Sequence, residues 1–212
     1  MDILQQIAES LQNGQASDVA ELTQKALEQG RTWQDILNKG LFAGMEVVGK
    51  LFAEEEIFLP EVLMVAKAMS TGVKILEPHM ALSGQTKVEK VVLGTVKGDL
   101  HDLGKKLVNI MLSGAGFEVI DLGVDVPAER FVSAAISEKA QLVGMSALLT
   151  TTMPHMRMVI EALKKAGLSS KVKTIVGGAC VTQAFADQIG ADAYGSNASD
   201  AVSKARKLLG LS

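Results

Sequence analysis

Position 101 holds a histidine whose neighbours are those of a metal ligand. Asp99 stands two residues before it, and Gly98 and Gly104 bound the short segment that contains both. A ligating imidazole commonly donates its second N–H to a carboxylate, which fixes the tautomer and makes the ring more basic. These residue types and this spacing predict that His101 is a metal ligand and that Asp99 is its hydrogen-bond partner.

The residues on either side indicate a turn between a strand and a helix. Residues 91–96 form an apolar run typical of a buried parallel strand, and residues 105–112 have helical periodicity. Open α/β sheets bind their ligands beyond the carboxyl ends of the strands. We therefore expect His101 at that edge of a sheet.

From residue 88 onward the sequence alternates between strand and helix patterns. Strands are expected at 90–96, 118–123, 141–147, 173–177 and 192–195, and helices at about 103–114, 128–138, 153–167, 181–188 and 199–209. Five such units predict an α/β fold with a flavodoxin-like, doubly wound, five-stranded parallel sheet.

The first 80 residues contain no convincing strand pattern. Helical patterns cover residues 2–11, 16–29, 32–52 and 59–80, which predicts an all-α four-helix bundle. A short polar stretch, 83–87, follows. We expect a helical domain at 1–82, a linker at 83–89 and the α/β domain at 90–212.

Composition narrows the possible partners. The 212 residues carry a formal net charge of −3 and no basic stripe, so a nucleic-acid partner is not expected. No apolar run reaches the roughly 18 residues of a membrane span, and the amino terminus lacks the pattern of a signal peptide. We expect a cytoplasmic protein without a membrane partner. Cys180 is the single cysteine, which excludes an iron–sulfur cluster held by this chain alone. Reduction of a bound metal would then need another protein.

Two further motifs follow the histidine segment. Residues 105–145 separate Gly104 from Ser146-Ala147-Leu148, and residues 149–176 separate that motif from Gly177-Gly178. The pattern D-x-H-x-x-G, S-x-L, G-G resembles the cobalamin-binding signature of methionine synthase, of B12-dependent mutases and of the small corrinoid proteins of methylotrophic and O-demethylating methyltransferase systems. The resemblance covers nearly the whole chain and is closest to the small corrinoid proteins.

The resemblance implies a cofactor and the residues that hold it. The cofactor would be cobalamin or a related corrinoid that cycles between methyl-Co(III) and Co(I), base-off, with His101 as the lower axial ligand. Asp99 and Thr152 would complete the ligand relay, although methionine synthase has serine where this chain has Thr152. Phe52 and Leu59 match residues of a helical cap that shields the cobalt-bound methyl group. The remaining cofactor-binding residues would be Gly98, Asp102, Gly104, Ser146, Leu148, Thr150, Gly177, Gly178 and Ala198.

The resemblance also implies a function. The chain would carry a methyl group on cobalt between a substrate:corrinoid methyltransferase and a second methyltransferase that delivers it to tetrahydrofolate or coenzyme M, with a reductive activator protein as a further partner. It would be the methyl-carrying subunit of a multi-component methyltransferase rather than a complete enzyme. A B12-binding sensor and the small cobalamin-binding subunit of a mutase are the alternatives.

Structural roles stay open for each of these residues. His101 alone is compatible with a capping histidine, and a zinc site would need further Cys, His or carboxylate ligands. Gly177-Gly178 is compatible with an ordinary turn after a strand, and the hydroxyl cluster near Thr152 with helix capping. Phe52 and Leu59 are compatible with core positions. Gly94 and Gly144, within two expected strands, are interpreted as widening a slot for the cofactor.

Overall fold

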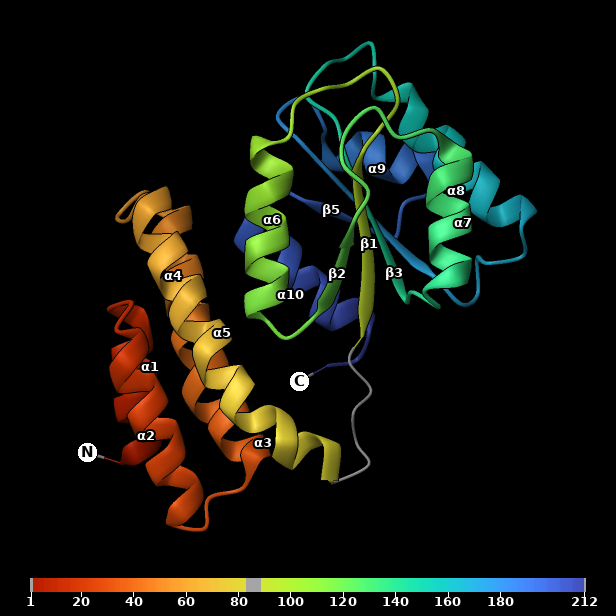
Figure 1. Cartoon of the computed structure of the whole chain (residues 1–212). Helices are drawn as coiled ribbons and strands as arrows, with labels where there is room; N and C mark the ends of the chain where they lie inside the picture. The colour runs from red at the N-terminus through yellow and green to blue at the C-terminus, as the bar shows by residue number, and fades with distance from the viewer. Residues whose placement is uncertain (1, 83–88, 212) are drawn as a thin grey trace. The chain divides into compact units, whose positions relative to one another are not determined.

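A computed structural model describes residues 2–82 and 89–211 of the chain (Figure 1). The chain divides into two compact units, Met1–Lys87 and Val88–Ser212, each with its own core. The expected linker at 83–89 lies outside the described residues except for its last position. No helix among the described residues has both the length and the apolar character needed to cross a membrane.

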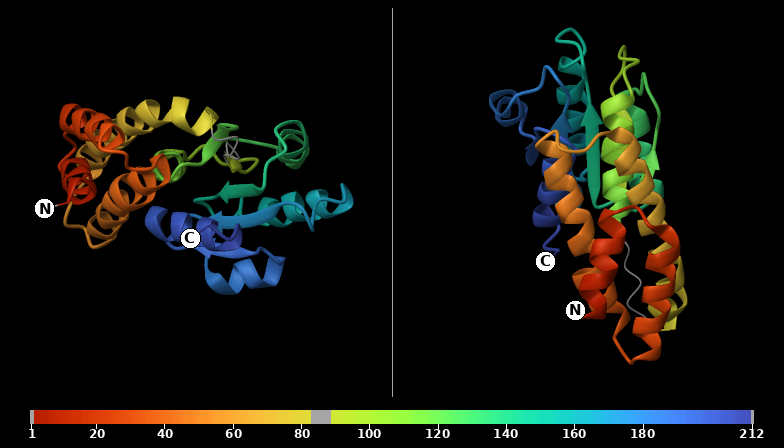
Figure 2. Two further views of the ribbon diagram at one scale, coloured as in Figure 1. Left: turned by 90° about the horizontal axis from the view of Figure 1, so that it is seen from below. Right: turned by 90° about the vertical axis from the view of Figure 1, so that its left-hand side faces the viewer.

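The first unit is entirely helical in its described part. Helices α1 (Ile3–Gln12) and α2 (Ala16–Glu28) are followed by a continuous rod of α3 (Trp33–Asp35), the π-helix η1 (Ile36–Phe42) and α4 (Ala43–Ala53), and then by α5 (Leu59–Leu82). The long helices run side by side (Figures 1 and 2) and bury an apolar core that includes Ile7, Leu11, Val19, Leu41 and Val48. The predicted four-helix bundle is confirmed.

The continuous rod of α3, η1 and α4 differs from the prediction in its local winding. The sequence predicts one regular helix at 32–52, whereas residues 36–42 wind as a π-helix. Glycines allow close contact with α1 here: a Cβ at Gly40 would lie 3.0 Å from Cγ2 of Ile7, and one at Gly44 would lie 2.7 Å from the carbonyl oxygen of Ala8. The apolar pattern does not distinguish a π-helix from an α-helix over so few residues.

The second unit is a five-stranded parallel sheet flanked by helices. Its strands are β1 (Lys90–Thr95), β2 (Glu118–Asp121), β3 (Leu142–Ser146), β4 (Lys173–Gly177) and β5 (Ala193–Gly195), in the order β2-β1-β3-β4-β5. The helices are α6 (Leu103–Gly114), α7 (Ala128–Ser137), α8 (Pro154–Lys165), α9 (Gln183–Ile189) and α10 (Ala198–Leu208). This strand order is that of flavodoxin, as predicted.

The helices of this unit cover both faces of the sheet (Figure 1). One core lies under α7, α8 and α9 and includes Phe131 and Met156, and the other lies under α6 and α10 and includes Leu112 and Ala205. Gly94 and Gly144 serve these cores, which corrects the slot interpretation. A Cβ at Gly94 would lie 2.8 Å from the Phe131 ring, and one at Gly144 would lie 2.7 Å from the Leu93 side chain, so the space beside each glycine is already filled.

The carboxyl ends of four strands lie in register. Thr95 of β1 pairs with Ser146 of β3, Ser146 pairs with Gly177 of β4, and Gly177 pairs with Gly195 of β5. The loops that follow these strands therefore emerge from one row at one edge of the sheet. The three sequence motifs begin within a few residues of this row.

Candidate functional site

His101 lies in the loop after β1 and is held by Asp99. Its ring nitrogen Nδ1 is 2.8 Å from Oδ1 of Asp99, and its backbone N–H donates to the same oxygen across 3.1 Å. The Asp99 side chain is fully buried, whereas about half of the His101 side chain, 51%, is exposed. An ionised carboxylate only accepts hydrogen bonds, so Nδ1 carries the proton and donates it. The Nε2 lone pair of the neutral ring is then available to a ligand.

The second oxygen of Asp99 joins this loop to the loop after β3. Oδ2 accepts hydrogen bonds from the backbone N–H of Leu148 at 2.8 Å, from that of Leu149 at 3.3 Å and from the Thr152 hydroxyl at 2.6 Å. Burial alone raises the pKa of Asp99, but the hydrogen bonds from Thr152, Leu148 and His101 outweigh it and hold this pKa well below its usual range. Asp99 is therefore charged at neutral pH.

Thr152 completes a hydrogen-bonded chain from His101 through Asp99. Its Oγ1 atom also lies 2.9 Å from the carbonyl oxygen of Leu149, but a hydroxyl has one proton and the charged carboxylate is the stronger acceptor. The hydroxyl therefore donates to Asp99. Threonine therefore makes this contact here, where methionine synthase has serine.

Asp125, which the sequence analysis did not identify, fixes the start of the His101 loop. Gly98 has a φ of +80°, and its N–H donates to the Asp125 carboxylate across 2.7 Å. The N–H of Asp125 in turn donates to the carbonyl oxygen of Asp99 across 3.0 Å. The only sequence signal for this residue is a turn composition before Pro127, which says nothing about its partner.

Large apolar side chains around His101 are unusually exposed. Leu100 and Leu103 are 71% and 70% exposed, and Leu148 and Leu149 are 40% and 42% exposed. Exposed apolar groups that gather around one polar side chain indicate a surface that a ligand covers. The four leucines therefore fit a broad, partly apolar group that lies over His101.

The motif glycines separate into two kinds. A Cβ at Gly178 would lie 1.9 Å from the carbonyl oxygen of Ala147, and one at Gly177 would lie 2.9 Å from that of Gly195, so the fold itself requires both glycines. A Cβ at Gly104 would meet no atom within 4 Å. The protein alone does not explain a glycine at 104, but a ligand lying against the start of α6 does.

The other predicted residues are distributed as follows. Asp102 forms an ion pair with Lys106 at 2.6 Å, and this hydrogen bond lowers the pKa of its carboxyl group. Ala198 is buried at the first position of α10, where the Asn197 side chain caps the helix by accepting from the Asp200 N–H at 2.8 Å. Ser146 is half-buried at the end of β3, and Thr150 is exposed. Phe52 and Leu59 belong to the helical unit and are half-buried.

The other two histidines lie on helices, one in each unit. His79 is in α5, and His155 is in α8 with its Nδ1 atom 3.2 Å from the carbonyl oxygen of Thr152. Within residues 2–82 and 89–211, no group of three or more His, Cys, Asp or Glu side chains is placed to hold a metal ion. A zinc site needs such a group, whereas a metal that brings its own equatorial ligands needs only one side chain.

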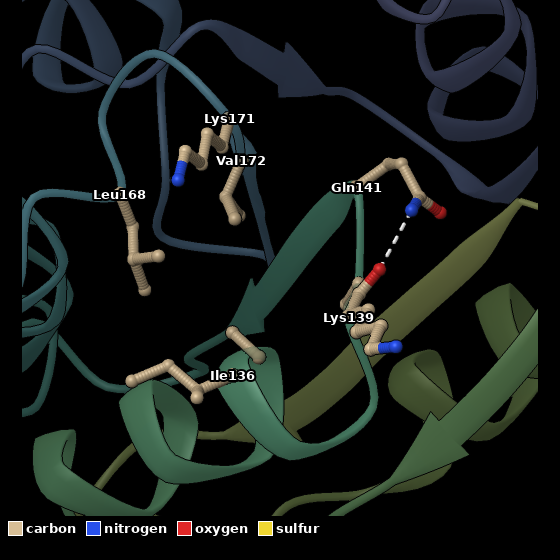
Figure 3. A pocket seen from close by; sticks show the side chains of 8 residues that line it. Ile136, Lys139, Gln141, Leu168, Lys171 and Val172 are labelled. Carbon is tan, nitrogen blue, oxygen red and sulfur yellow. Dashed lines mark hydrogen bonds between the residues drawn. The ribbon is translucent and has the colours of Figure 1, made fainter.

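A separate hollow of about 290 Å³ opens where β3 and β4 begin, which is the opposite edge of the sheet (Figure 3). Side chains from the end of α7 and from the segments that precede these strands line it, among them Ile136, Leu168 and Lys171. The predicted site residues are not part of its lining.

Comparison with known proteins identifies the family. Two family models, each described as a B12 binding domain, match residues 89–203 and residues 3–77. The dimethylamine corrinoid protein 3 of Methanosarcina acetivorans is 48% identical over 207 residues, which cover 98% of this chain and 97% of the relative. The chain belongs to the corrinoid proteins of methyltransferase systems. Binding of a corrinoid follows from this membership.

Solved structures agree with the assignment to the corrinoid proteins. A cobalamin-binding protein from Desulfitobacterium hafniense matches with a TM-score of 0.82 and 30% identity, covering 98% of each chain. A methanol:cobalamin methyltransferase complex from Methanosarcina barkeri matches with a TM-score of 0.79 and 36% identity, covering 98% of this chain and 80% of that one. Both units of this corrinoid protein are therefore included in the similarity.

Proposed function

We propose that this corrinoid protein carries a methyl group on the cobalt of a base-off corrinoid, with His101 as the lower axial ligand. The observation that carries the proposal is the half-exposed His101 ring, whose Nδ1 atom is fixed on the buried Asp99 carboxylate. When bound, the corrinoid supplies a cobalt centre that accepts a methyl group from one partner and yields it to another.

Asp99 and Thr152 set how strongly His101 donates to the metal. The Asp99 carboxylate accepts a hydrogen bond from the Nδ1–H group, which increases the electron density at Nε2. Donors to the other oxygen of Asp99, the Thr152 hydroxyl and two backbone N–H groups, draw charge away from the imidazole. The balance between these two sets of hydrogen bonds determines how strongly Nε2 of His101 donates to the metal.

The loops at the carboxyl edge hold the rest of the cofactor. The open space at Gly104 and the exposed leucines beside His101 support contact with a flat ring at this point. The proposed contacts of the nucleotide tail lie at or just beyond the ends of β3, β4 and β5 and come from Ser146, Thr150, Gly177, Gly178 and Ala198. Gly98 and Asp102 bound the His101 loop, with Gly98 in the left-handed conformation that the turn requires.

We assign Phe52 and Leu59 the role of shielding the upper face of the cofactor. Both are half-buried in the helical unit, so part of each apolar side chain is available for contact. An apolar cover would exclude water and oxidants from the cobalt centre. The basis of this assignment is the resemblance of the surrounding residues to the methionine synthase cap.

The partners follow from the carrier role. A substrate:corrinoid methyltransferase supplies the methyl group, a second methyltransferase delivers it to tetrahydrofolate or coenzyme M, and an activator protein restores the reduced cobalt. The relatives favour a methylated amine as donor, because several that match nearly the whole chain at 47–48% identity are dimethylamine corrinoid proteins.

The ligation is tested with isotope-labelled histidine. The corrinoid-loaded protein is prepared with 15N-histidine, and the electron paramagnetic resonance spectrum of its Co(II) form is recorded. We expect the label to change the superhyperfine splitting, His101→Ala to abolish that effect, and His155→Ala to preserve it. An identical spectrum with and without the label would exclude His101 as the lower ligand.

The donor assignment is tested separately. The loaded, reduced protein is mixed with purified dimethylamine- or methanol-specific methyltransferases and their substrates, and the corrinoid absorption spectrum is followed. Methylation at a higher rate with the dimethylamine enzyme supports the assignment. Faster methylation with the methanol enzyme contradicts it.

A further inference from the structure

Thr95, the last residue of β1, makes a side-chain contact with the backbone of His101. Its Oγ1 atom donates to the His101 carbonyl oxygen across 3.0 Å, and the Thr95 residue is fully buried. A buried hydroxyl group without a hydrogen-bond partner is unfavourable, so the contact has a strong preference to persist. It ties His101 to the sheet by a route that does not pass through Asp99.

The backbone of Thr95 is itself held on both sides. Its N–H donates to the carbonyl oxygen of Gly123 across 3.0 Å, and its own carbonyl oxygen accepts from the N–H of Val126 at the same distance. On the other side it pairs in register with Ser146. The Thr95 hydroxyl is therefore a fixed point at the end of a rigid strand.

The far end of the His101 loop is anchored to the same region. Lys105, in the first turn of α6, is only 2% exposed and donates to both carboxylate oxygens of Asp121 at the end of β2. Asp121 also accepts from the N–H of Gly123 at 2.9 Å. Gly123 thus connects the anchor of α6 with the backbone of Thr95, and the loop between them has little freedom to move His101.

We propose that Thr95 is a positioning residue for the lower axial ligand. Its hydroxyl holds the carbonyl side of the His101 backbone and so limits how far Nε2 reaches from the sheet, while Asp99 accepts from the His101 N–H and sets the rotation and tautomer of the ring. Metal–ligand distances in proteins stay within about 0.2 Å of their preferred values, so a small displacement of this backbone changes the coordination. The inference rests on His101 being the ligand, as proposed above.

The test compares two substitutions that differ in the hydroxyl. Thr95→Val keeps the shape and loses the donor, whereas Thr95→Ser keeps the donor. With the 15N-histidine-labelled, corrinoid-loaded protein, we expect Thr95→Val to shift the equilibrium between coordinated and detached His101 toward the detached form by about 10-fold or more, the size typical of groups that orient a metal ligand. The Co(II)/Co(I) midpoint should move positive with it. Thr95→Ser should retain the wild-type spectrum and midpoint.

Thr174→Val provides the matched control. Thr174 is also buried in this sheet, near the start of β4, and its hydroxyl donates to the Asp192 carboxylate at 2.9 Å. Its loss should lower the urea midpoint of unfolding while leaving the cobalt spectrum unchanged. If Thr95→Val does not fold, Thr95→Ala, which also lacks the hydroxyl, replaces it in the comparison.

The outcomes separate this inference from the proposed function. If 15N-histidine leaves the Co(II) spectrum of the wild-type protein unchanged, His101 is not the ligand and both proposals are wrong. Wild-type coordination that persists in Thr95→Val, or that is lost equally in Thr95→Ser, overturns the role of the hydroxyl alone. Loss of coordination in Thr174→Val would also overturn it, because the effect would then follow from general loosening of the sheet.

Discussion

Thr152 donates its hydroxyl proton to Asp99 across 2.6 Å, although 53 residues separate them in the sequence. The contact joins the loops that follow β1 and β3, which are neighbouring strands. Leu148 and Leu149 donate backbone N–H groups to the same carboxylate oxygen. Asp99 therefore has two tasks, because one of its oxygens orients His101 and the other holds the end of β3 in place.

Asp99→Asn should weaken both the orientation of His101 and the attachment of the loop after β3. An asparagine offers one acceptor oxygen, whereas Asp99 accepts bonds at two, so either His101 or the group of donors around Leu148 faces an NH2 group instead. We expect unfolding free energy to fall by about 2 kcal/mol or more, since bonds to a charged group are lost. In the loaded protein, His101 coordination should weaken and the Co(II)/Co(I) midpoint should move positive. Spectroelectrochemical titration measures the midpoint.

Further substitutions define the specificity of this effect. Asp187→Asn changes a carboxylate on α9 that accepts from Gln183 and leaves Asp99 in place, so the midpoint should not move. Thr152→Val should act like Asp99→Asn but more weakly, and Thr152→Ser should behave like the wild type because it keeps the hydroxyl. If Asp99→Asn keeps the wild-type Co(II)/Co(I) midpoint potential, Asp99 has only a structural role in the turn.

The lowered pKa of Asp99 predicts a dependence of stability on acid. A carboxyl group whose pKa is lower in the folded than in the unfolded state stabilises the fold above its unfolded value, about 3.9, and this contribution is lost as the pH falls through the folded value. The difference in unfolding free energy between wild type and Asp99→Asn should therefore narrow below about pH 4. Urea titrations at pH 7, 5 and 3 measure it, and a constant difference would contradict the assignment.

Phe52→Ala should expose the upper face of the bound cofactor if this side chain shields it. We expect faster photolysis of the bound methylated corrinoid than in the wild type, because a smaller side chain leaves more room for the separated methyl group to escape. Leu59→Ala should act in the same direction. Met158→Ala, which removes an apolar side chain that is 53% exposed on α8, is the control. Equal photolysis rates in all four proteins would show that Phe52 and Leu59 do not shield the cofactor.

The sequence is sufficient to predict the helices and strands and their order, because the patterns that mark them are local in the chain. Apolar runs such as residues 91–96 and the glycines between them mark strands and turns, and alternation with helices fixes a parallel sheet. The spacing of the three motifs places Asp99, His101 and Leu148 at one edge of the predicted sheet. The observed strands begin and end within about two residues of the predicted ones, the usual uncertainty at such boundaries.

The contacts that the sequence could not predict are those between residues distant in the chain. Thr95 has the pattern of an ordinary strand residue, and its hydroxyl gains a partner only because the next loop folds back over β1. Asp125 likewise meets Gly98 only through the pairing of β1 with β2. The glycine within β1 illustrates the reverse error: Gly94 suggested space for a cofactor, and the Phe131 ring from α7 fills that space.

Thr23→Val should stabilise the helical unit. Thr23 in α2 is fully buried, and its hydroxyl oxygen has no hydrogen-bond partner among the residues that the structure describes. Valine has the same shape and carries a methyl group in place of the unsatisfied hydroxyl, so unfolding free energy should rise by about 1 kcal/mol. Thr174→Val, where the hydroxyl is bonded, should change stability in the opposite direction. A urea titration of each variant measures both signs, and a less stable Thr23→Val protein would indicate a partner for this hydroxyl.

Gly104→Ala should separate folding from cofactor binding. A Cβ at this position meets no atom within 4 Å and lies in the first turn of α6, so alanine should raise the stability of the unloaded protein by up to about 1 kcal/mol. If the corrinoid lies against this position, the added methyl group should cost about 1–3 kcal/mol of binding free energy, which is a loss of roughly 5- to 150-fold in affinity.

Gly178→Ala is the matched comparison. Its φ of +129° and the overlap with Ala147 predict a loss of about 3 kcal/mol or more in unfolding free energy before any cofactor is added. Urea titration of the unloaded proteins and equilibrium binding of cob(II)alamin to the folded ones measure the two effects. Wild-type affinity in Gly104→Ala would place the cofactor elsewhere, because nothing else in the described structure accounts for a glycine at the start of α6.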